Sequence, residues 1–475
     1  MKVLLANMPI KFNSNENLEP PLGISYIGAV LKEDGNTVHL KDYEVDEFET
    51  TNLEQFIKKH GIQIVGVSFR TASYRSAKEF TKTVKSINCD IKIVLGGQHV
   101  TAFPEETLSD MKCDIAIRGE GEYTFRDLIR EIKKKKDFNR IYNATPIVDI
   151  NALPMPLREG LPLEKYNVIT IITSRGCPFN CIYCDKGVST RTVKFRSAEK
   201  VLKEIRYIVK TLKKKRLYIV DDYFILNRKN AEDILDSIIG EKLSITWTCQ
   251  ARVDGIDRRI IEKAKKAGCE QIMFGIESGD EQELKYMRKE TTNKQAAGAV
   301  ALTKEYGITA RANFMLGFPI STKEMARNTI KFAKKLRPDI VRFFAVAPLP
   351  NTDLWRELYG DKFNANDISW DSIDFFKPNF DTIEIKKNEI PLYVSAAYWH
   401  VLKLDFLKEI TLFLIPKMAK VLYLCFKTGR VRGNISRVFP RSVNLILDNL
   451  HQLEGVGVKE KIKFLSEAWR LERTI

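Results

Sequence analysis

The sequence predicts an α/β protein with an N-terminal doubly wound, Rossmann-like domain, a partial (β/α)6 TIM-type barrel and a C-terminal helical extension. Three observations support this prediction. Short apolar runs alternate with amphipathic stretches over residues 1–145, the same alternation resumes with a clear period after residue 190, and the strand pattern disappears from about residue 386. The expected domains are residues 1–145, 146–385 and 386–475 of the 475-residue chain.

The first domain has the pattern of a parallel sheet with helices on both faces. Its expected strands are residues 2–6, 62–68, 91–95 and 114–117, and its expected helices include residues 24–31, 76–86 and 123–133. Ligands bind such sheets at the carboxyl ends of the strands. The loops expected there contain Pro21 and Gly23, Gly96 and Gly97, and a run of alternating glycine and glutamate over residues 119–122. Glycine lets the backbone approach a large ligand closely. A proline-marked stretch, residues 148–158, is the expected linker.

The second domain is expected to contain six strands. One precedes residue 177, and the others are residues 216–220, 244–249, 271–274, 311–316 and 340–346. In barrels of this kind the functional side chains lie at the carboxyl ends of the strands. The polar residues at those positions are Asp221, Asp222, Arg252, Glu277 and Ser278. Each of them could instead be a helix N-cap or part of an ion-paired scaffold, because spacing alone does not assign partners.

Three cysteines, Cys177, Cys181 and Cys184, follow the first strand of the second domain with the spacing C-x3-C-x2-C. Three thiolates can bind three irons of a [4Fe–4S] cluster and leave the fourth iron open to a ligand from outside the protein. A zinc knuckle or three structural thiols is the alternative, but no fourth cysteine lies nearby. The loop resembles the signature loop of the radical S-adenosylmethionine (SAM) superfamily, in which SAM binds the open iron. The resemblance implies that Tyr183 lies near the adenine of SAM.

The polar strand ends have chemistry that suits SAM. Asp221 and Asp222 are candidates to accept hydrogen bonds from its cationic amino group. Arg252 is a candidate to pair with its carboxylate. Glu277 and Ser278 are candidates to bind its ribose hydroxyls or its methionine end.

The glycine loops of the first domain, followed by the cysteine loop, resemble the cobalamin-dependent radical SAM enzymes over residues 1–385. The resemblance implies cobalamin contacts from Pro21, Gly23, Ser68, Gly96, Gly97, Gln98, His99 and Glu120. Corrinoid domains that bind cobalt through histidine use the motif Asp-x-His-x-x-Gly, which this sequence lacks. The resemblance therefore implies base-off cobalamin with no histidine on cobalt, and we expect His99 to contact corrin side chains or to cap a helix.

The family resemblance implies that a [4Fe–4S] cluster cleaves SAM reductively and that methylcobalamin supplies a methyl group to an unactivated carbon. Oxidative cyclisation or ring contraction of a lipid or secondary metabolite is an alternative outcome. A methylthiotransferase acting on RNA is less consistent with the sequence, because Cys89 and Cys113 cannot supply the second three-cysteine cluster that such an enzyme needs. A non-catalytic corrinoid carrier would leave the cysteine loop without a purpose. Expected partners are a small-molecule or lipid-like substrate and a reductant such as flavodoxin or ferredoxin, with no nucleic acid.

Composition limits the location of the protein. An oxygen-sensitive cluster and eight unevenly spaced cysteines indicate a reducing compartment, so we expect a cytoplasmic protein without disulfides. The net charge of +16 permits contact with an anionic surface. Residues 406–442 combine eight basic residues and one acid with bulky apolar side chains, a pattern typical of a helix that lies on a membrane surface. A helical cap on the barrel is the equally consistent alternative, and no stretch is long and apolar enough to span a membrane.

Overall fold

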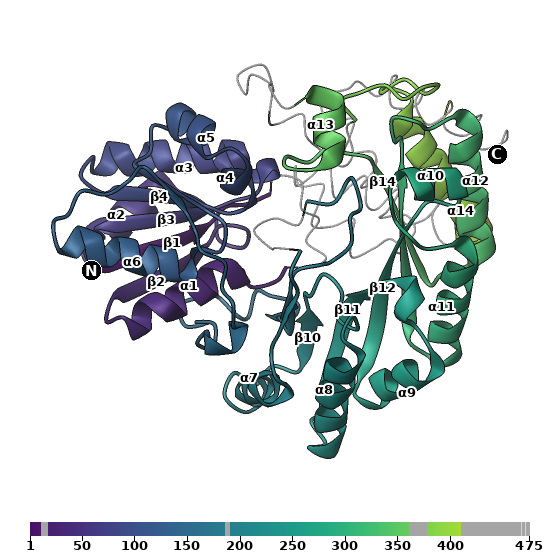
Figure 1. The fold of residues 1–475 in the computed structure, drawn as a ribbon, viewed down its shortest axis with the longest axis horizontal. Helices are drawn as coiled ribbons and strands as arrows, with labels where there is room; N and C mark the ends of the chain where they lie inside the picture. Colours follow the sequence, from purple (N-terminus) through teal and green to yellow (C-terminus); the bar gives the residue numbers. More distant parts are fainter. Residues whose placement is uncertain are drawn as a thin grey trace. The chain divides into compact units, whose positions relative to one another are not determined.

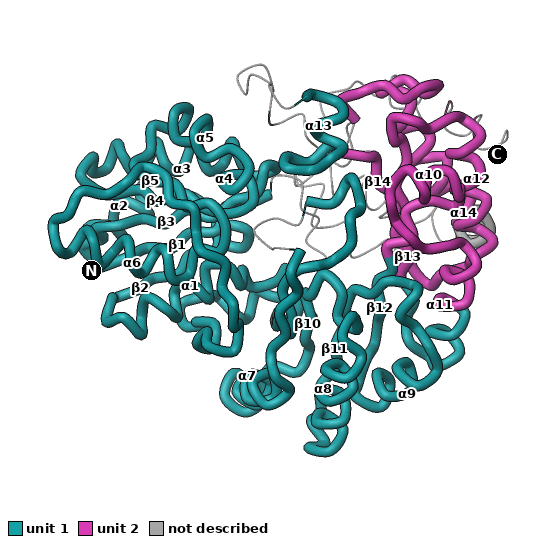
Figure 2. The backbone as a smooth tube through the Cα atoms, viewed as in Figure 1, with its two compact units in different colours: residues 1–274, 301–310, 348–373 teal, residues 275–300, 311–347, 374–475 magenta. Residues whose placement is uncertain are grey.

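The computed structural model describes residues 1–10, 18–185, 191–360, 370, 378–409, 467 and 471. The chain divides into two compact units (Figure 2). Unit 1 consists of residues 1–274, 301–310 and 348–373, and unit 2 of residues 275–300, 311–347 and 374–475. The division into three domains expected from the sequence stays a prediction.

The N-terminal part of unit 1 is a doubly wound sheet of parallel strands (Figure 1). In spatial order the strands are β2 (Thr37–Asp42), β1 (Lys2–Asn7), β3 (Ile64–Ser68), β4 (Lys92–Gly96), β5 (Ile115–Arg118) and β6 (Ile141–Asn143). The helices are α1 (Leu22–Glu33), α2 (Thr50–His60), α3 (Tyr74–Ile87), α4 (Gln98–Ala102), α5 (Pro104–Met111) and α6 (Gly121–Lys133). Helices α1 and α6 pack together, whereas α3 packs against α2 and α5 on the other face.

The inner strands form because their residues are apolar on both faces. Residues 3–6 of β1 and residues 64–67 of β3 are all buried, as is typical of a parallel strand covered by helices on both sides. Leu5, Ile64 and Val94 belong to one hydrophobic core with residues of α1 and α6. The expected doubly wound fold is confirmed, with two further strands at the sheet edges. The edge strands β2 and β6 were missed because they alternate polar and apolar residues or are very short.

The second sheet has six strands in sequential order, as the partial barrel predicts. They are β7 (Ile169–Ile171), β10 (Arg216–Ile219), β11 (Thr246–Ala251), β12 (Cys269–Glu277), β13 (Thr309–Leu316) and β14 (Ile340–Ala345). The remaining helices are α7 (Ala198–Lys210), α8 (Arg228–Gly240), α9 (Arg258–Lys266), α10 (Glu281–Tyr286), α11 (Asn293–Glu305), α12 (Lys323–Leu336), α13 (Asp353–Tyr359) and α14 (Ile390–Glu409). Short polar side chains start several of these helices by accepting a hydrogen bond from the first turn, as Ser197 does for α7 and Thr322 for α12.

A short antiparallel hairpin of β8 (Ser174–Arg175) and β9 (Lys194–Phe195) lies outside both large sheets. The expected linker, residues 148–158, leads to this part of unit 1 and ends in a buried ion network. Arg158 lies 2.5 Å from Glu204 of α7, and Arg196 lies 2.6 Å from the same carboxylate. Because a buried carboxylate needs compensating charge, this network joins the end of the linker to helix α7.

The basic segment expected to contact a membrane, residues 406–442, lies outside the described residues except for its first four, which end α14 and whose side chains are not described. Within the described part of the chain, no helix is long and apolar enough to cross a membrane.

Candidate functional site

The three cysteines of the C-x3-C-x2-C motif lie on the loop between β8 and β9, just beyond the carboxyl end of β7. Gly176 enters this loop with a φ of 97°, a conformation that favours glycine. The backbone turns tightly inside the loop, where Cys184 N donates to Cys181 O at 3.2 Å. Cys177 and Cys181 are half-buried residues and Cys184 is exposed, so none of the three cysteines is sealed in the core.

No three His, Cys, Asp or Glu side chains converge on a single metal position within the described ranges. This finding does not conflict with a cluster, because the cysteines of a [4Fe–4S] cube bind different irons. The donor chemistry, three thiols on one short loop, therefore fits a cluster and not a single metal ion.

Asp221 holds the entrance of the cysteine loop. Its side chain is fully buried and accepts hydrogen bonds from Thr173 N at 2.6 Å, from Ser174 Oγ at 2.7 Å and from the Thr173 hydroxyl. Burial raises the pKa of Asp221 above its usual value, although the hydrogen bonds from Thr173 and Ser174 oppose this effect. Both carboxylate oxygens are thus engaged by the scaffold, whereas Asp222, the next residue, is exposed.

Arg252 lies against the cysteine loop. Its guanidinium is 3.6 Å from the ring centroid of Phe179, a residue between Cys177 and Cys181, and it forms an ion pair of 2.9 Å with Asp254. Burial works to lower the pKa of Arg252, but Asp254 and the nearby Cys181 thiol raise it overall. The positive charge of Arg252 is therefore held close to the candidate cluster ligands. Tyr183, in the same loop, is half-buried.

The strand-end residues Glu277 and Ser278 belong to unit 2. Glu277 has a φ of 69° and forms an ion pair of 3.0 Å with the buried Lys289. A left-handed backbone at a non-glycine residue costs conformational energy, and such strained residues are often found at functional sites. Ser278 is fully buried, and its hydroxyl bonds Glu283 at 2.6 Å and Thr329 at 2.8 Å. Ser278 therefore forms hydrogen bonds within the protein scaffold, and these partners could not be assigned from the sequence alone.

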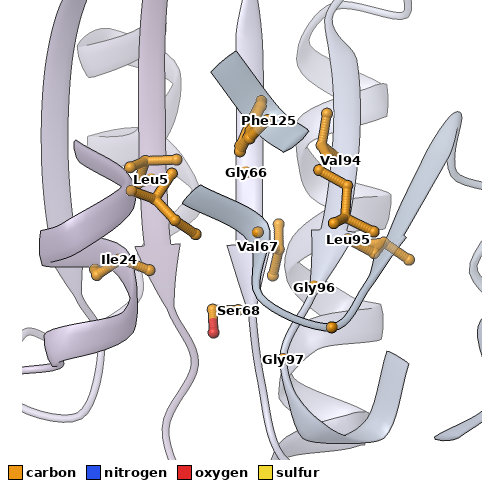
Figure 3. Close-up of a pocket in the computed structure, with 14 residues that line it drawn as sticks. Leu5, Ile24, Gly66, Val67, Ser68, Val94, Leu95, Gly96, Gly97 and Phe125 are labelled. Atoms are coloured by element: carbon orange, nitrogen blue, oxygen red, sulfur yellow. The ribbon is translucent and has the colours of Figure 1, made fainter. Parts of the chain in front are cut away.

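The N-terminal sheet contains an apolar cavity of about 50 Å³ between the strands and helices α1 and α6 (Figure 3). Its walls include Leu5, Ile24, Val67, Leu95 and Phe125, whose side chains are shown around it. Ser68, Gly96 and Gly97 lie at its end nearest the carboxyl ends of β3 and β4. Since one water needs about 10–15 Å³, the cavity has room for a small group of apolar atoms.

Glycines border the cavity for steric reasons. Gly97 has a φ of 99°, and a Cβ there would lie 2.5 Å from Phe69 O and 2.8 Å from Phe69 N. A Cβ on Gly66 would lie 2.7 Å from side-chain atoms of both Leu5 and Phe125. Glycine is therefore required at Gly97 by the backbone and favoured at Gly66 by packing.

Only part of the predicted cobalamin-binding set lines this cavity. Ser68, Gly96 and Gly97 do, whereas Pro21 is the N-cap of α1, Gly23 is in its first turn and Gln98 begins α4. Gly119 and Gly121, which also line it, belong to the glycine–glutamate loop that the sequence placed at this edge. Sequence reasoning missed the remaining wall residues, which are Leu5, Ile24, Ile27, Gly66, Val67, Val94, Leu95, Ile117 and Phe125. The available signal was a glycine inside the apolar strand β3.

His99 is packed among aromatic side chains. Its ring lies 4.7 Å from that of Trp370 and 4.8 Å from that of Tyr74, and its Nδ1 is 3.1 Å from Thr71 Oγ1. Its Nε2 is buried and has no hydrogen-bond partner among the described residues. Burial lowers the pKa of His99 to about 3, so the ring is neutral at physiological pH.

Glu120 makes contacts within the protein through both carboxylate oxygens. Oε1 lies 3.2 Å from Arg175 Nη1, and Oε2 lies 2.7 Å from Lys194 Nζ and accepts from Ile147 N at 2.8 Å. Its side chain is 2% exposed. Glu120 thus lies against the hairpin that carries the cysteine loop, and its contact to cobalamin stays a prediction.

Comparisons with known proteins agree with this geometry. Residues 12–129 match the B12 binding domain family, and residues 171–333 match the radical SAM superfamily. Two solved structures have the same fold at low sequence identity. The cobalamin-dependent SAM radical enzyme OxsB has a TM-score of 0.71 at 21% identity, over 99% of this chain and 79% of that chain. The radical SAM methyltransferase TsrM from Kitasatospora setae has a TM-score of 0.66 at 18% identity, over 75% of each chain.

The combination of a B12-binding domain with a radical SAM domain defines the class of enzyme. An uncharacterized methyltransferase of Pyrococcus horikoshii is 34% identical over 400 residues, which cover 80% of this chain and 87% of that protein. An anaerobic magnesium-protoporphyrin IX monomethyl ester cyclase of Rubrivivax gelatinosus is 28% identical, over 76% of this chain and 69% of that protein. The chain belongs to the cobalamin-dependent radical SAM enzymes. The expected cofactors, cobalamin, SAM and a [4Fe–4S] cluster, are thereby confirmed.

Proposed function

We propose that this enzyme transfers a methyl group to an unactivated carbon of a small or lipid-like molecule. The relative that is 34% identical is named a methyltransferase. A more distant relative, at 25% identity, is the hopanoid C-2 methylase of Rhodopseudomonas palustris. These names support methyl transfer as the reaction and an apolar molecule as the substrate class.

The observation that carries the proposal is the presence of two complementary sites in unit 1. One is the apolar cavity bordered by Ser68, Gly96 and Gly97, which fits a small apolar part of cobalamin. The other is the loop of Cys177 and Cys181 with Cys184, which fits a cluster with one open iron. When bound, cobalamin supplies a methyl group and the reduced cluster supplies the electron that cleaves SAM.

The protein residues position these groups and exclude water. Asp221 fixes the start of the cysteine loop, and Arg252 covers Phe179 within it. In our proposal Asp222 accepts a hydrogen bond from the amino group of SAM, and Glu277 bonds a ribose hydroxyl. From its position before the third cysteine, we propose that Tyr183 lies near the adenine.

Pro21, Gly23, Ser68, Gly96 and Gly97 remain the proposed contacts to cobalamin, as do Gln98 and His99. The aromatic side chains of Tyr74 and Trp370, which contact the His99 ring, support the prediction that no histidine binds cobalt. Electron paramagnetic resonance (EPR) of the Co(II) form tests this prediction. Nitrogen superhyperfine splitting from an axial ligand would contradict it.

Oxidative cyclisation is the second candidate reaction, because three relatives at 26–28% identity are named anaerobic magnesium-protoporphyrin IX monomethyl ester cyclases. The two reactions differ in the mass of the product. Methyl transfer adds one carbon from SAM, whereas cyclisation without methyl transfer adds none. Labelled SAM therefore separates them.

The test uses the full chain, reconstituted anaerobically with iron, sulfide and cobalamin and reduced by flavodoxin or dithionite. We expect 5′-deoxyadenosine to form, and a small molecule from an extract of a deletion strain to gain a trideuterated methyl group from methyl-labelled SAM. Product that forms with 5′-deoxyadenosine but without deuterium would favour cyclisation. No 5′-deoxyadenosine from a protein with full cluster content would contradict both reactions.

The reductant and any membrane contact are also proposals. We infer that a flavodoxin or ferredoxin delivers the electron and that residues 406–442 bind an anionic surface. Each basic residue near such a surface contributes on the order of 1 kcal/mol. Co-sedimentation with anionic but not neutral vesicles at low salt is the expected result, and equal partitioning to both would reject membrane docking.

A further inference from the structure

Two carboxylates of the N-terminal domain and two cations of the β8–β9 hairpin form one buried ion network. Glu120 bonds both Arg175 and Lys194, at 3.2 and 2.7 Å, and Glu122 bonds Arg175 at 2.7 Å. The side-chain exposures are 2% for Glu120, 6% for Glu122, 9% for Lys194 and 11% for Arg175. The network therefore contains two positive and two negative charges out of contact with most of the solvent.

Burying four charged side chains costs desolvation free energy, which their ion pairs must offset. Arg175 and Lys194 are directly opposite each other in the antiparallel hairpin, and like charges in that position repel. The two glutamates cancel the repulsion, and Glu120 also accepts from the backbone N–H of Ile147, just before the linker. The Arg175 guanidinium lies 5.0 Å from the ring centroid of Tyr26 on α1, which adds a further contact to the same domain. A fully satisfied polar network of this kind selects one arrangement of the segments that it joins.

The network joins the two candidate cofactor sites. Gly119 and Gly121, on either side of Glu120, both line the apolar cavity. Arg175 is two residues before Cys177, in the strand that leads into the cysteine loop. A short chain of buried contacts therefore runs from the wall of the cavity to the first candidate cluster ligand, all within unit 1.

We propose that Glu120, Glu122, Arg175 and Lys194 are positioning residues that hold the cobalamin site at a fixed distance and orientation from the cluster loop. The inference rests on the proposed function only in that both cofactors serve one reaction. One substrate must react with groups from both cofactors, so the separation of the two cofactor sites needs to be constant. Misplacement of the reacting groups by about 1 Å can lower the rate on the order of a hundredfold. In this role Glu120 does not bind cobalamin.

The distance between the two cofactors can be measured directly. The reconstituted full chain, with Co(II) cobalamin and a reduced cluster, is compared with Glu120→Gln by pulsed EPR of the interaction between the two paramagnetic centres. We expect a narrow distance distribution in the wild type and one that is wider by about twofold or more in the variant, because a half-satisfied network no longer selects one arrangement. Cobalamin and iron contents should remain those of the wild type.

Two further variants complete the test. Glu241→Gln is the matched control, since it breaks a solvent-exposed ion pair with Arg206 and should leave the distribution unchanged. The double variant Glu120→Gln with Lys194→Met removes one charge of each sign, so it provides a folded protein if Glu120→Gln alone does not fold. The double variant should also show the wider distribution, because Arg175 then keeps Glu122 as its one partner in the network.

Two results would overturn the inference. The first is a distribution as narrow as that of the wild type in every folded variant that contains both cofactors. The second is loss of cobalamin from a variant with full cluster content, which would make Glu120 a cobalamin contact. Neither result depends on the reaction product, so failure of the proposed methyl transfer would be seen separately, as the absence of deuterium in the product of the wild-type enzyme.

Discussion

The two adjacent aspartates at the end of β10 should behave differently when each is changed to alanine. Asp221 is fully buried and holds Thr173 and Ser174 at the entrance of the cysteine loop, whereas Asp222 is exposed. We expect Asp221→Ala to destabilise the protein and to lower its cluster content. We expect Asp222→Ala to keep stability and cluster content but to weaken SAM binding.

The size of the effect follows from the hydrogen bonds of Asp221. Its loss leaves the buried Thr173 N–H without a partner, at a cost of about 1–3 kcal/mol. The hydroxyls of Thr173 and Ser174 can rotate toward other acceptors, so they add less. Burial raises the pKa of Asp221, because removing the charged carboxylate from water costs free energy. The substitution removes this desolvation cost, which offsets part of the lost stability. The net loss in free energy of unfolding should therefore be about 3 kcal/mol and not the full sum of three charge-assisted bonds.

Urea unfolding of the apo-protein measures stability, and iron and sulfide analysis after reconstitution measures cluster content. Calorimetric titration with SAM separates the two variants. The reasoning is refuted if Asp221→Ala unfolds within about 0.5 kcal/mol of the wild type and retains a full cluster, since surface changes usually stay within that range.

Three further outcomes are expected. Gly97→Ala should lower the free energy of unfolding by about 2 kcal/mol or more and should also lower cobalamin content, because a left-handed backbone and the nearby carbonyl of Phe69 exclude a Cβ. The cobalamin stoichiometry of the variant measures this effect, and full occupancy would contradict it. Burial lowers the pKa of His99 to about 3, whereas the ordinary histidine pKa is about 6.5. Below pH 6.5 the unfolded chain therefore binds a proton at His99 that the folded chain does not bind. The free energy of unfolding then decreases by about 1.4 kcal/mol for each unit by which the pH is lowered. His99→Phe should remove this contribution, about 2 kcal/mol at pH 5, and urea midpoints of variant and wild type that fall equally between pH 7 and 5 would argue against it. Lys289→Met should weaken SAM binding by about tenfold with the cluster intact, because it leaves the Glu277 carboxylate without its ion-pair partner; unchanged SAM affinity would show that the pair is scaffold.

Most of the fold could be predicted from the sequence because parallel strands covered on both faces are continuous apolar runs. The strands β1, β3, β4 and β5 have this pattern, and so the expected ranges agree with the observed ones to within about two residues. The missed elements are those that do not bury both faces. The edge strand β2 alternates polar with apolar residues, and the β8–β9 hairpin has only two residues in each strand.

The cysteine loop was identified from the sequence because its ligands are neighbours along the chain. Spacing, Gly176 and the preceding strand are all local properties, and a three-thiol site needs little more. The identity of the class of enzyme follows from the same loop together with the glycines of the first domain. These features do not depend on which distant segments meet.

The partners of the other polar residues were decided by tertiary structure alone. Asp221 and Asp222 are the same residue type in the loop after β10, but the side chain of Asp221 is fully buried in the scaffold and Asp222 is exposed. For Glu120 the family resemblance implied a contact to cobalamin, but only the tertiary structure shows that Arg175 and Lys194, 55 and 74 residues away, bond its carboxylate. A buried charged side chain is stable only where it forms ion pairs with opposite charges. Those ion pairs depend on how the fold brings together segments that are far apart in the chain.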